Sequence, residues 1–312
     1  MTLNRVEALM LQLCDTDVTG RIVQDHLHTG GKRLRARLAL SATAALGADP
    51  EQGIGWAAAC ELAHNATLVH DDIEDGDTTR RGHPTVWTLH GVPQAINAGD
   101  LLFMLPFLAL EHINAEATLR WRLSQTLAAR LGAVIRGQGR EMALRATWHI
   151  DRAAYLDAIT GKTSGLFALP VEGAACLAGH DPLALAKPFS TLGVIFQLQD
   201  DVLDLYGNKG REKPGSDLRE GKISALVVEH LALCPNDKNW LVDILKAPRQ
   251  NTSQTDVDAA IKRFADSGAL ASVLRQIHQM VQATQQGAPA PLKDLLADIL
   301  DLILQPIAHL QQ

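Results

Sequence analysis

Two acidic pentads, each at the end of an apolar and helix-patterned run, constrain this chain more than any other feature. They are DDIED at residues 71–75 and DDVLD at residues 200–204. On a helix, residues four apart are neighbours, so the first and last aspartates of each pentad face one another. Like charges at the negative end of a helix repel unless a cation lies between them. Carboxylate and phosphate oxygens are the ligands of hard divalent cations, so the pattern predicts a Mg²⁺ cluster that grips a polyphosphate.

The composition favours an all-α fold. Hydrophobic residues make up 46% of the chain and aromatic residues only 4%. Helix formers such as alanine and leucine dominate, and the alternation typical of strands is scarce. A chain of 312 residues is long enough for two domains. Because no long linker or internal repeat divides it, we predict one helical domain over residues 1–312.

The charge, cysteine content and hydropathy of the chain indicate in which compartment it works and which partners it lacks. The net charge of −6 gives no reason to expect nucleic-acid binding. Four scattered cysteines form no CxxC pair, which fits a reducing cytoplasm. The N-terminus lacks the pattern of a signal peptide, and the apolar stretch at 101–110 is shorter than the ~20 residues that span a bilayer. We therefore expect a cytoplasmic protein without a transmembrane segment.

The expected helices are separated by glycines, prolines and polar clusters. They cover residues 4–27, 33–46, 52–75, 91–110, 114–146, 152–178, 183–206, 222–233, 238–247 and 256–285, and Pro291 opens a last helix. The polar segment 76–84 is predicted to be a loop. Residues 207–221, rich in glycine, lysine and aspartate, are predicted to form a mobile loop.

Basic residues lie near the first pentad in the sequence. Arg80 and Arg81 follow it within a loop, and arginines suit the oxygens of a diphosphate. The segment GKRLR at 31–35 opens a helix, whose free N–H groups favour an anion, and Lys32 and Arg35 would share a face. Alone, a single pentad is more often a solvated helix end, and the basic motif fits a solvated helix start equally well. A second full pentad favours the diphosphate site.

The second pentad also has polar neighbours. Gln197 lies one helical turn before it, and the loop beyond it supplies Lys213, Asp217 and Lys222. Such a loop is usually solvated surface, but beside a polyanion it would act as a closing lid. The segment GKTS at 161–164 is similar to a P-loop. The required earlier glycine is replaced by a leucine and the neighbourhood is helical, so we reject nucleotide binding.

Over residues 28–227 these motifs, in this order, resemble those of the trans-isoprenyl diphosphate synthases, also called polyprenyl synthetases. The similar segments include 61–64 and 68–75, 95–100, 196–204 and 217–222. Several motifs in the right order are far more specific than any one of them. The resemblance implies a helical bundle around a central cavity, usually as a homodimer. It also implies condensation of an allylic diphosphate with isopentenyl diphosphate into a longer all-trans polyprenyl diphosphate.

The resemblance assigns a role to each candidate residue. Three Mg²⁺ would be held by Asp71, Asp72, Asp75, Asp200 and Asp204. The allylic diphosphate would contact Arg80, Lys162, Thr163, Gln197 and Lys213. Isopentenyl diphosphate would bind Lys32, Arg35, His64 and Arg81. Asp201 and Lys162 complete the predicted catalytic set, and Lys222 the substrate-binding set.

This assignment suits the chemistry of prenyl transfer. Mg²⁺ and cationic side chains would stabilise the departing diphosphate, so that the allylic C–O bond ionises. The double bond of isopentenyl diphosphate then attacks the cation and a proton is lost, so no protein nucleophile is needed. The chain departs from the family pattern near the lid. Asn208, Ser224 and Leu226 replace common residues, and the spacing from Lys213 to Asp217 is one residue short.

The same resemblance places the floor of the product tunnel on the helix before the first pentad. Ala66, Ala63 and Ala59 share one face of it without bulk, and Trp56 comes next. Trp56 is 71 − 56 = 15 residues below the first aspartate, or ~22 Å at 1.5 Å per residue. That distance corresponds to roughly four or five prenyl units. We therefore predict a C20 product, geranylgeranyl diphosphate, with C25 or longer as an alternative.

Other interpretations remain open at this stage. Alanines at helical spacing fit close helix packing equally well, and Phe103 and Phe107 on the opposite wall would favour a C15 product. A class I terpene cyclase shares the first motif, but normally has an Asn/Ser/Glu-type second motif. An inactive regulatory subunit would have lost aspartates, whereas this chain keeps all six.

Overall fold

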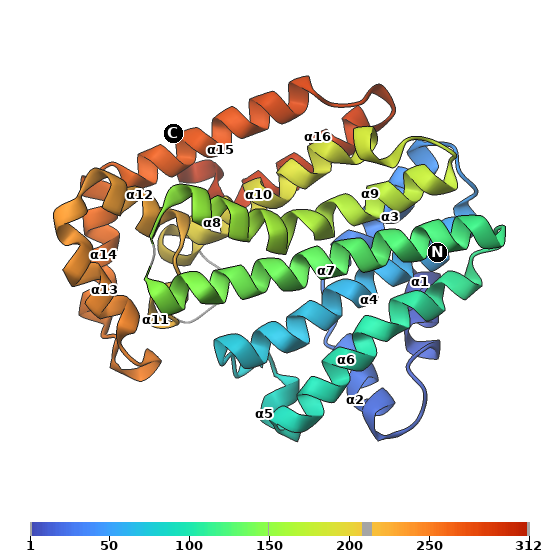
Figure 1. Ribbon diagram of the computed structural model, residues 1–312, viewed down its shortest axis with the longest axis horizontal. Helices are drawn as coiled ribbons and strands as arrows, with labels where there is room; N and C mark the ends of the chain where they lie inside the picture. The colour runs from blue at the N-terminus through green and yellow to red at the C-terminus, as the bar shows by residue number, and fades with distance from the viewer. Residues whose placement is uncertain (1, 149, 208–213, 311–312) are drawn as a thin grey trace. The chain divides into compact units, whose positions relative to one another are not determined.

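The computed structural model describes residues 2–148, 150–207 and 214–310. These residues are almost entirely helical, which confirms the predicted all-α class (Figure 1). The exception among them is a small antiparallel pair of two-residue strands, β1 (Thr79–Arg80) and β2 (His83–Pro84).

The chain forms two compact units. Unit 1 contains Met1–Leu131 and Leu166–Lys187, and unit 2 contains Gly132–Gly165 and Pro188–Gln312. Helices α7 (Ala117–Thr147) and α10 (Pro182–Tyr206) contribute to both units. A single domain over residues 1–312 therefore stays a prediction.

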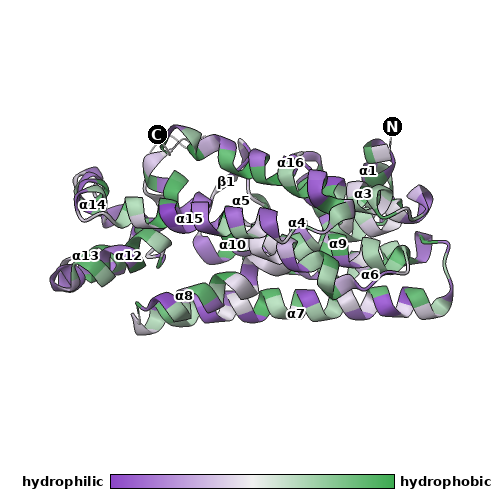
Figure 2. Ribbon diagram, turned by 90° about the horizontal axis from the view of Figure 1, so that it is seen from above, coloured by the Kyte–Doolittle hydropathy of each residue, from purple (hydrophilic) through white to green (hydrophobic). Residues whose placement is uncertain are grey.

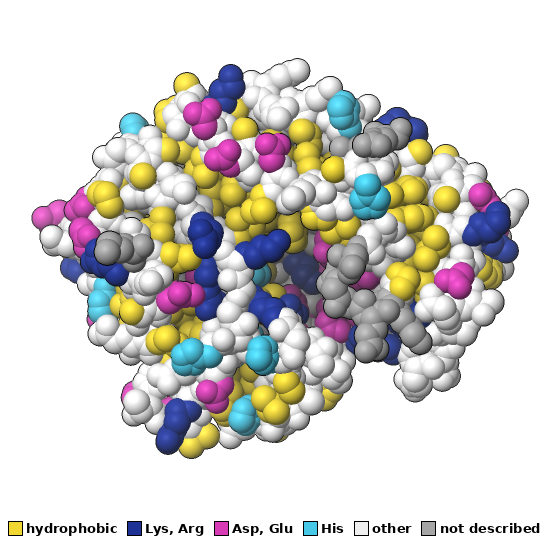
Figure 3. All heavy atoms as spheres, turned by 180° about the vertical axis from the view of Figure 1, so that it is seen from behind, with side chains coloured by type: hydrophobic (Ala, Val, Ile, Leu, Met, Phe, Trp, Pro, Cys, Tyr) yellow, Lys and Arg dark blue, Asp and Glu magenta, His cyan; other side chains and the backbone are white. Residues whose placement is uncertain are grey.

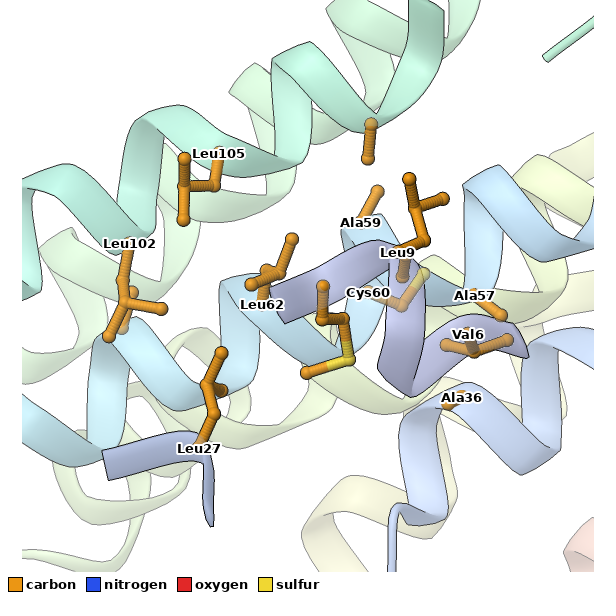
Figure 4. Packing of buried hydrophobic residues seen from close by; sticks show 14 of the residues in the cluster. Val6, Leu9, Leu27, Ala36, Ala57, Ala59, Cys60, Leu62, Leu102 and Leu105 are labelled. Carbon is orange, nitrogen blue, oxygen red and sulfur yellow. The ribbon is translucent and has the colours of Figure 1, made fainter. Parts of the chain in front are cut away.

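Unit 1 is built around the long helix α4 (Pro50–Asp75), which packs mainly on α6 (Val92–Ala109) and α3 (Leu34–Ala45). Figure 4 shows Ala59 and Leu62 on the side of α4 that faces α6, the helix that carries Leu102 and Leu105. These residues belong to a fully buried apolar core. The other elements of the unit are α1 (Thr2–Gln12), α2 (Val18–His28), α5 (Val86–His90), the 3₁₀ turn η1 (Leu110–His112) and α9 (Gly165–Leu177).

Unit 2 contains α8 (Arg152–Ile159) and α12 (Ala225–Leu233), followed by amphipathic helices. Figure 2 shows patches of hydrophobic and hydrophilic residues along α15 and α16. In the last helix, Leu296, Ile299 and Ile303 are buried, whereas Leu302 is exposed. The other elements are the π-turn η2 (Thr160–Ser164), α11 (Ser216–Arg219), η3 (Pro235–Asp237), α13 (Lys238–Lys246), η4 (Arg249–Asn251), α14 (Gln254–Asp266), α15 (Ala269–Gln286), η5 (Ala290–Leu292), α16 (Lys293–Leu304) and η6 (Gln305–Leu310).

Three predicted helices are wrong in their continuity. The helix predicted over 4–27 is broken because Asp17 caps α2, accepting the Gly20 N–H at 2.6 Å. The helix predicted over 256–285 is broken at Gly268, whose φ of +83° lies in the left-handed region. The helix predicted over 152–178 is interrupted by the π-turn η2.

The apolar stretch at 101–110 is part of a longer helix than the sequence predicted. Val92–His112, formed by α6 and η1, has the length and mean hydropathy of a membrane span and is the one such helix among the described residues. The sequence prediction stopped at the polar residues that interrupt the apolar run, although the helix continues through them. Because α6 packs along α4 in the core of unit 1, the segment has the contacts of a core helix.

Candidate diphosphate and metal site

The first pentad ends α4 at a left-handed glycine. Gly76, with φ +68°, donates to the Ile73 carbonyl, and Asp77 donates to the Asp72 carbonyl at 3.0 Å. These bonds form a Schellman motif, which turns the chain sharply into the β1–β2 hairpin. The sharp turn explains how a basic hairpin can fold back beside an acidic helix end.

The aspartates of this pentad differ in exposure. Asp72 is buried, and its Oδ1 accepts hydrogen bonds from Arg80 Nε at 2.8 Å and Nη2 at 2.6 Å. Burial raises the pKa of Asp72 to about 6, although the Arg80 guanidinium opposes the shift. Asp71 and Asp75 are only half-buried. The helix end therefore turns one carboxylate inward and two toward solvent.

The hairpin directs Arg81 toward the start of α3. Arg81 and Gly82 have φ of +54° and +79°, the conformation of a type I′ turn. The Arg81 guanidinium donates to the Gly30 carbonyl. Gly31 has φ +126°, a conformation that favours glycine, and a Cβ atom there would lie 2.6 Å from Arg81 Cζ. The glycines of the basic motif thus make room for an arginine.

Four arginines of unit 1 form a cationic cluster, namely Arg33, Arg35, Arg80 and Arg81. Burial, together with the charges of Arg33 and Arg80, lowers the pKa of Arg81. Burial lowers the pKa of Arg35 to about 10, and its guanidinium lies 4.7 Å from the ring centroid of Phe167. Such mutual repulsion is relieved by a bound polyanion. The predicted Lys32 lies exposed at the edge of this motif.

Buried polar groups near the arginine cluster form hydrogen bonds that hold the neighbouring helices in place. Glu61 accepts the Ala36 N–H at 3.1 Å and so holds the start of α3. Asn65 donates to the Glu61 carbonyl at 2.8 Å and contacts His26 Nε2 at 3.2 Å. Burial lowers the pKa of His26 to about 4 and that of His64 far below its usual range. Both imidazoles are therefore neutral beside the arginines.

Four of these residues had no role predicted from the sequence: His26, Arg33, Glu61 and Asn65. Arg33 donates to Glu7 at 2.9 Å and to the Leu27 carbonyl at 2.7 Å, so its side chain holds neighbouring elements together. A signal was present for Glu61 and Asn65. Both interrupt an otherwise apolar helix face, and buried polar groups in proteins are normally hydrogen-bonded.

The second pentad, in unit 2, also contains both buried and half-buried carboxylates. Asp201 is buried and accepts hydrogen bonds from Tyr155 Oη at 2.6 Å, the Ala225 N–H at 2.6 Å and Gln197 Nε2 at 2.9 Å. Burial, with the nearby Asp217 charge, raises the pKa of Asp201 to about 7.

Asp204 is buried too, whereas Asp200 is half-buried. The Asp204 carboxylate accepts the Asp217 N–H at 3.1 Å, and its carbonyl accepts the Gly215 N–H at 2.9 Å. The aspartate thus ties the returning loop to the end of α10. In both pentads, the buried aspartates hold neighbouring elements in place.

The segment that is similar to a P-loop is the π-turn η2, which carries Lys162 and Thr163. The backbones of α7 and α10 approach this turn closely at two glycines. A Cβ on Gly137 would lie 2.2 Å from Lys162 N, and one on Gly193 would lie 2.5 Å from Ser164 Cα. Lys162 Nζ pairs with Glu141 at 2.8 Å, and Thr163 Oγ1 donates to Gln197 at 3.2 Å. Such turns are frequent at functional sites.

The predicted lid is described in part. Lys222 Nζ pairs with Glu220 at 2.7 Å and lies 3.9 Å from Asp217. Lys213 and Asn208 lie outside the described residues. Lys222 is therefore held by acidic neighbours of its own segment.

The candidate residues form two groups, one in each unit. Unit 1 brings together the first pentad, the basic hairpin and the arginine cluster, and unit 2 brings together the second pentad, the π-turn and the lid segment. Among the described residues, no three Asp, Glu, His or Cys side chains gather as a ready metal site. The donor set still fits Mg²⁺, because it consists of hard carboxylate oxygens and Asp72 Oδ2 is buried without a hydrogen-bond partner. Figure 3 shows basic, acidic and apolar side chains interspersed on one face.

The predicted tunnel residues Ala59, Ala63, Ala66 and Trp56 are all fully buried. The Trp56 indole donates to the Pro170 carbonyl at 2.9 Å. A Cβ on Gly173 would lie 1.8 Å from the indole, so α9 fixes the Trp56 side chain. The alanine face lies largely against α6, as expected for close helix packing. Its role as a tunnel floor stays a prediction.

Comparison with known proteins extends these observations over most of the chain. The family model described as Polyprenyl synthetase matches residues 17–264. The short chain isoprenyl diphosphate synthase of Methanothermobacter thermautotrophicus is 32% identical over 90% of this chain and 88% of its own. The geranylgeranyl diphosphate synthase of Sulfolobus acidocaldarius is 38% identical over 70% of this chain and 68% of its own. The crystal structure of polyprenyl synthase from Caulobacter crescentus, complexed with calcium and isoprenyl diphosphate, has a TM-score of 0.86 at 28% identity, covering 97% of this chain and 94% of that one.

Proposed function

The chain belongs to the polyprenyl synthetase family of trans-prenyltransferases, and we propose that it makes geranylgeranyl diphosphate from isopentenyl diphosphate and an allylic diphosphate. The observation that carries the proposal is the repeated design of the pentads. Each helix end buries some carboxylates against structural partners and leaves others half-buried at the surface. Such ends are unfavourable without cations, so a metal–diphosphate complex is their natural complement.

We assign Mg²⁺ to both pentads, three ions in all. The half-buried Asp71, Asp75 and Asp200 are the principal ligands, and Asp72 and Asp204 complete the set. Bound Mg²⁺ would neutralise the leaving diphosphate and so favour ionisation of the allylic C–O bond. Asp201, with three donors of its own, holds α10 in position and is not assigned as a metal ligand.

The two diphosphates are assigned to different groups of side chains. The arginine cluster of unit 1 suits isopentenyl diphosphate, which would bind Lys32, Arg35, Arg81 and the neutral His64. The allylic diphosphate would contact Arg80, Lys162, Thr163 and Gln197, with Lys222 and Lys213 on the lid. Arginine forks and the lysine ammonium suit the non-bridging oxygens of these groups.

A C20 product is favoured by Trp56 and by the small residues above it. The indole is fixed by Pro170 and Gly173, so it would form a rigid floor. We expect Ala66→Phe to shorten the main product, as judged by chromatography of the chains formed. An unchanged product distribution from a folded Ala66→Phe variant would mean that this face serves helix packing alone. If the wild-type product were C15, or C25 and longer, residues other than Trp56 would form the floor of the tunnel.

A homodimer in the cytoplasm is the setting we propose. On α6, the apolar Ile96, Met104 and Leu108 are 45%, 56% and 45% exposed at helical spacing. Exposed apolar stripes of this kind commonly mark contact surfaces. The described cysteines are all free, which suits a reducing compartment. Sedimentation of wild type against Met104→Glu tests the dimer, because a charge at this position would favour the monomer.

The deciding assay supplies labelled isopentenyl diphosphate with each short allylic starter and Mg²⁺. We expect both substrates to be consumed and a longer diphosphate to be formed, with activity lost on chelation of the metal. A hydrocarbon formed from farnesyl diphosphate alone would indicate a cyclase instead. Absence of any product under all these conditions would indicate an inactive subunit.

A further inference from the structure

A buried tyrosine hydroxyl connects the parts of unit 2 that carry the predicted allylic contacts. Tyr155 lies on α8, is 4% exposed, and donates to Asp201 Oδ2 at 2.6 Å. The same oxygen accepts the Ala225 N–H, also at 2.6 Å, from the first residue of α12. A phenylalanine would keep the ring and lose this hydrogen bond, so the substitution isolates the role of the hydroxyl.

The other oxygen of Asp201 extends the connection to the π-turn. Asp201 Oδ1 accepts Gln197 Nε2 at 2.9 Å, and Gln197 Oε1 accepts Thr163 Oγ1 at 3.2 Å. One carboxylate therefore links α8, α10, α12 and η2. Because a buried carboxylate is costly without donors, each of its three donors restrains where it can point.

This arrangement bears directly on the second pentad. Asp200 and Asp201 are adjacent on α10, so they point about 100° apart around the helix. Holding Asp201 inward fixes the rotation of α10, and with it the direction in which Asp200 faces. The start of α12 lies three residues beyond Lys222, so the lid segment is anchored to the same carboxylate.

We propose that Tyr155 is a positioning residue for the allylic diphosphate and its metal ions, an inference that rests on the proposed prenyl transfer. Its hydroxyl fixes Asp201, and Asp201 in turn sets the positions of Asp200, Thr163 and the start of α12. All these contacts lie within unit 2, whereas the arginine cluster assigned to isopentenyl diphosphate lies in unit 1.

The test is steady-state kinetics of Tyr155→Phe. We expect KM for the allylic diphosphate to rise about tenfold, equivalent to ~1.4 kcal/mol, and the Mg²⁺ concentration for half-maximal rate to rise with it. KM for isopentenyl diphosphate should change less than about twofold, since the described contacts of Tyr155 and Asp201 lie in unit 2 and the arginine cluster lies in unit 1. A general loss of folded protein would instead lower kcat and leave both KM values and the Mg²⁺ dependence unchanged.

The second of the chain's two tyrosines supplies a matched control. Tyr206 is half-buried, and its hydroxyl donates to the Ile261 carbonyl at 2.6 Å. Tyr206→Phe should lower the melting temperature to a similar extent as Tyr155→Phe, with wild-type KM values and Mg²⁺ dependence. If both variants share the wild-type values, Tyr155 is not a positioning residue.

A second variant covers failure of Tyr155→Phe to fold. Ala225→Pro removes the other donor to Asp201 Oδ2 at the first position of α12, where proline is well tolerated. The preceding Ser224 has φ −86° and ψ 169°, which is compatible with a following proline. We expect the same selective rise in allylic KM, and unchanged kinetics would overturn the inference. An inactive wild type would overturn the proposed function and this inference with it, whereas an active wild type with silent variants overturns only this one.

Discussion

Two glycines on α7 offer a direct test of how Lys162 is positioned. A Cβ on Gly137 would lie 2.2 Å from Lys162 N and 2.5 Å from Gly161 C, both backbone atoms. A Cβ on Gly139, two residues along the same helix, would meet nothing within 4 Å. Gly137→Ala and Gly139→Ala therefore add the same methyl group to the same helix. They differ only in what that methyl group contacts.

The expected stabilities follow from two opposing effects. Replacing glycine by alanine inside a helix stabilises the fold by ~0.8–1 kcal/mol, and this gain is the same at both positions. At Gly137 the π-turn must also move by 3.4 − 2.2 = 1.2 Å to reach ordinary contact. Overpacking of this kind costs typically ~1–3 kcal/mol, and the upper value applies where backbone has to move. We expect Gly137→Ala to be destabilised by ~2 kcal/mol and Gly139→Ala to be stabilised by ~1 kcal/mol.

Urea unfolding measures this difference, and kinetics measures its consequence. Since the displaced segment carries Lys162 and Thr163, KM for the allylic diphosphate should rise about tenfold in Gly137→Ala, equivalent to ~1.4 kcal/mol. Gly139→Ala should keep the wild-type KM. Equal stability of the two variants, together with equal KM values, would refute the claim that close backbone packing sets the position of the π-turn.

Three further predictions concern unit 1. Gly31→Ala should raise KM for isopentenyl diphosphate about tenfold, or ~1.4 kcal/mol, because its methyl group displaces the Arg81 guanidinium; an unchanged KM in steady-state kinetics would contradict this. The folded pKa of His26 is lowered to about 4, so the unfolded state binds more protons below pH 6.5 and stability falls as the pH drops from about 6.5 to about 4. Between pH 7.5 and 5, the free energy of unfolding of the wild type should fall by ~2 kcal/mol more than that of His26→Gln, as measured by urea unfolding at each pH. Arg130→Met should cost ~3 kcal/mol by leaving Glu172 buried and unpaired, whereas the double variant with Glu172→Met should recover most of that loss in the same assay.

Sequence alone was sufficient where the signal is local. The pentads and the glycine that ends α4 are readable from neighbouring residues, because helix ends are set within a few positions. The segment 76–84, by contrast, was predicted to be a loop and contains the β1–β2 hairpin. The all-α class follows in the same way from composition and periodicity. The family resemblance then gave candidate residues for each substrate.

Sequence could not reveal which aspartates of a pentad face inward. Asp71 and Asp72 are identical in type and adjacent, but Asp72 is buried and accepts a hydrogen bond from Arg80. Tyr155 on α8, one of the three donors to Asp201, lies 46 residues away in the sequence. Likewise, His26 and Asn65 are paired across 39 residues. Such pairings depend on tertiary packing, which local propensities do not encode.

The arginine cluster and the buried carboxylates together explain why substrate should stabilise this fold. Unit 1 holds arginines whose pKa values are lowered by burial and by one another, so free energy of repulsion is present before any ligand binds. A diphosphate bound to the native state alone removes that repulsion and shifts the unfolding equilibrium by mass action. At a concentration 100 times its Kd, the shift is ~2.7 kcal/mol. Neutral His64 and His26 fit the same logic, since a protonated imidazole would add to the repulsion in the free protein. The site is therefore arranged at some cost to the unliganded fold, as expected where binding groups are positioned in advance of the ligand.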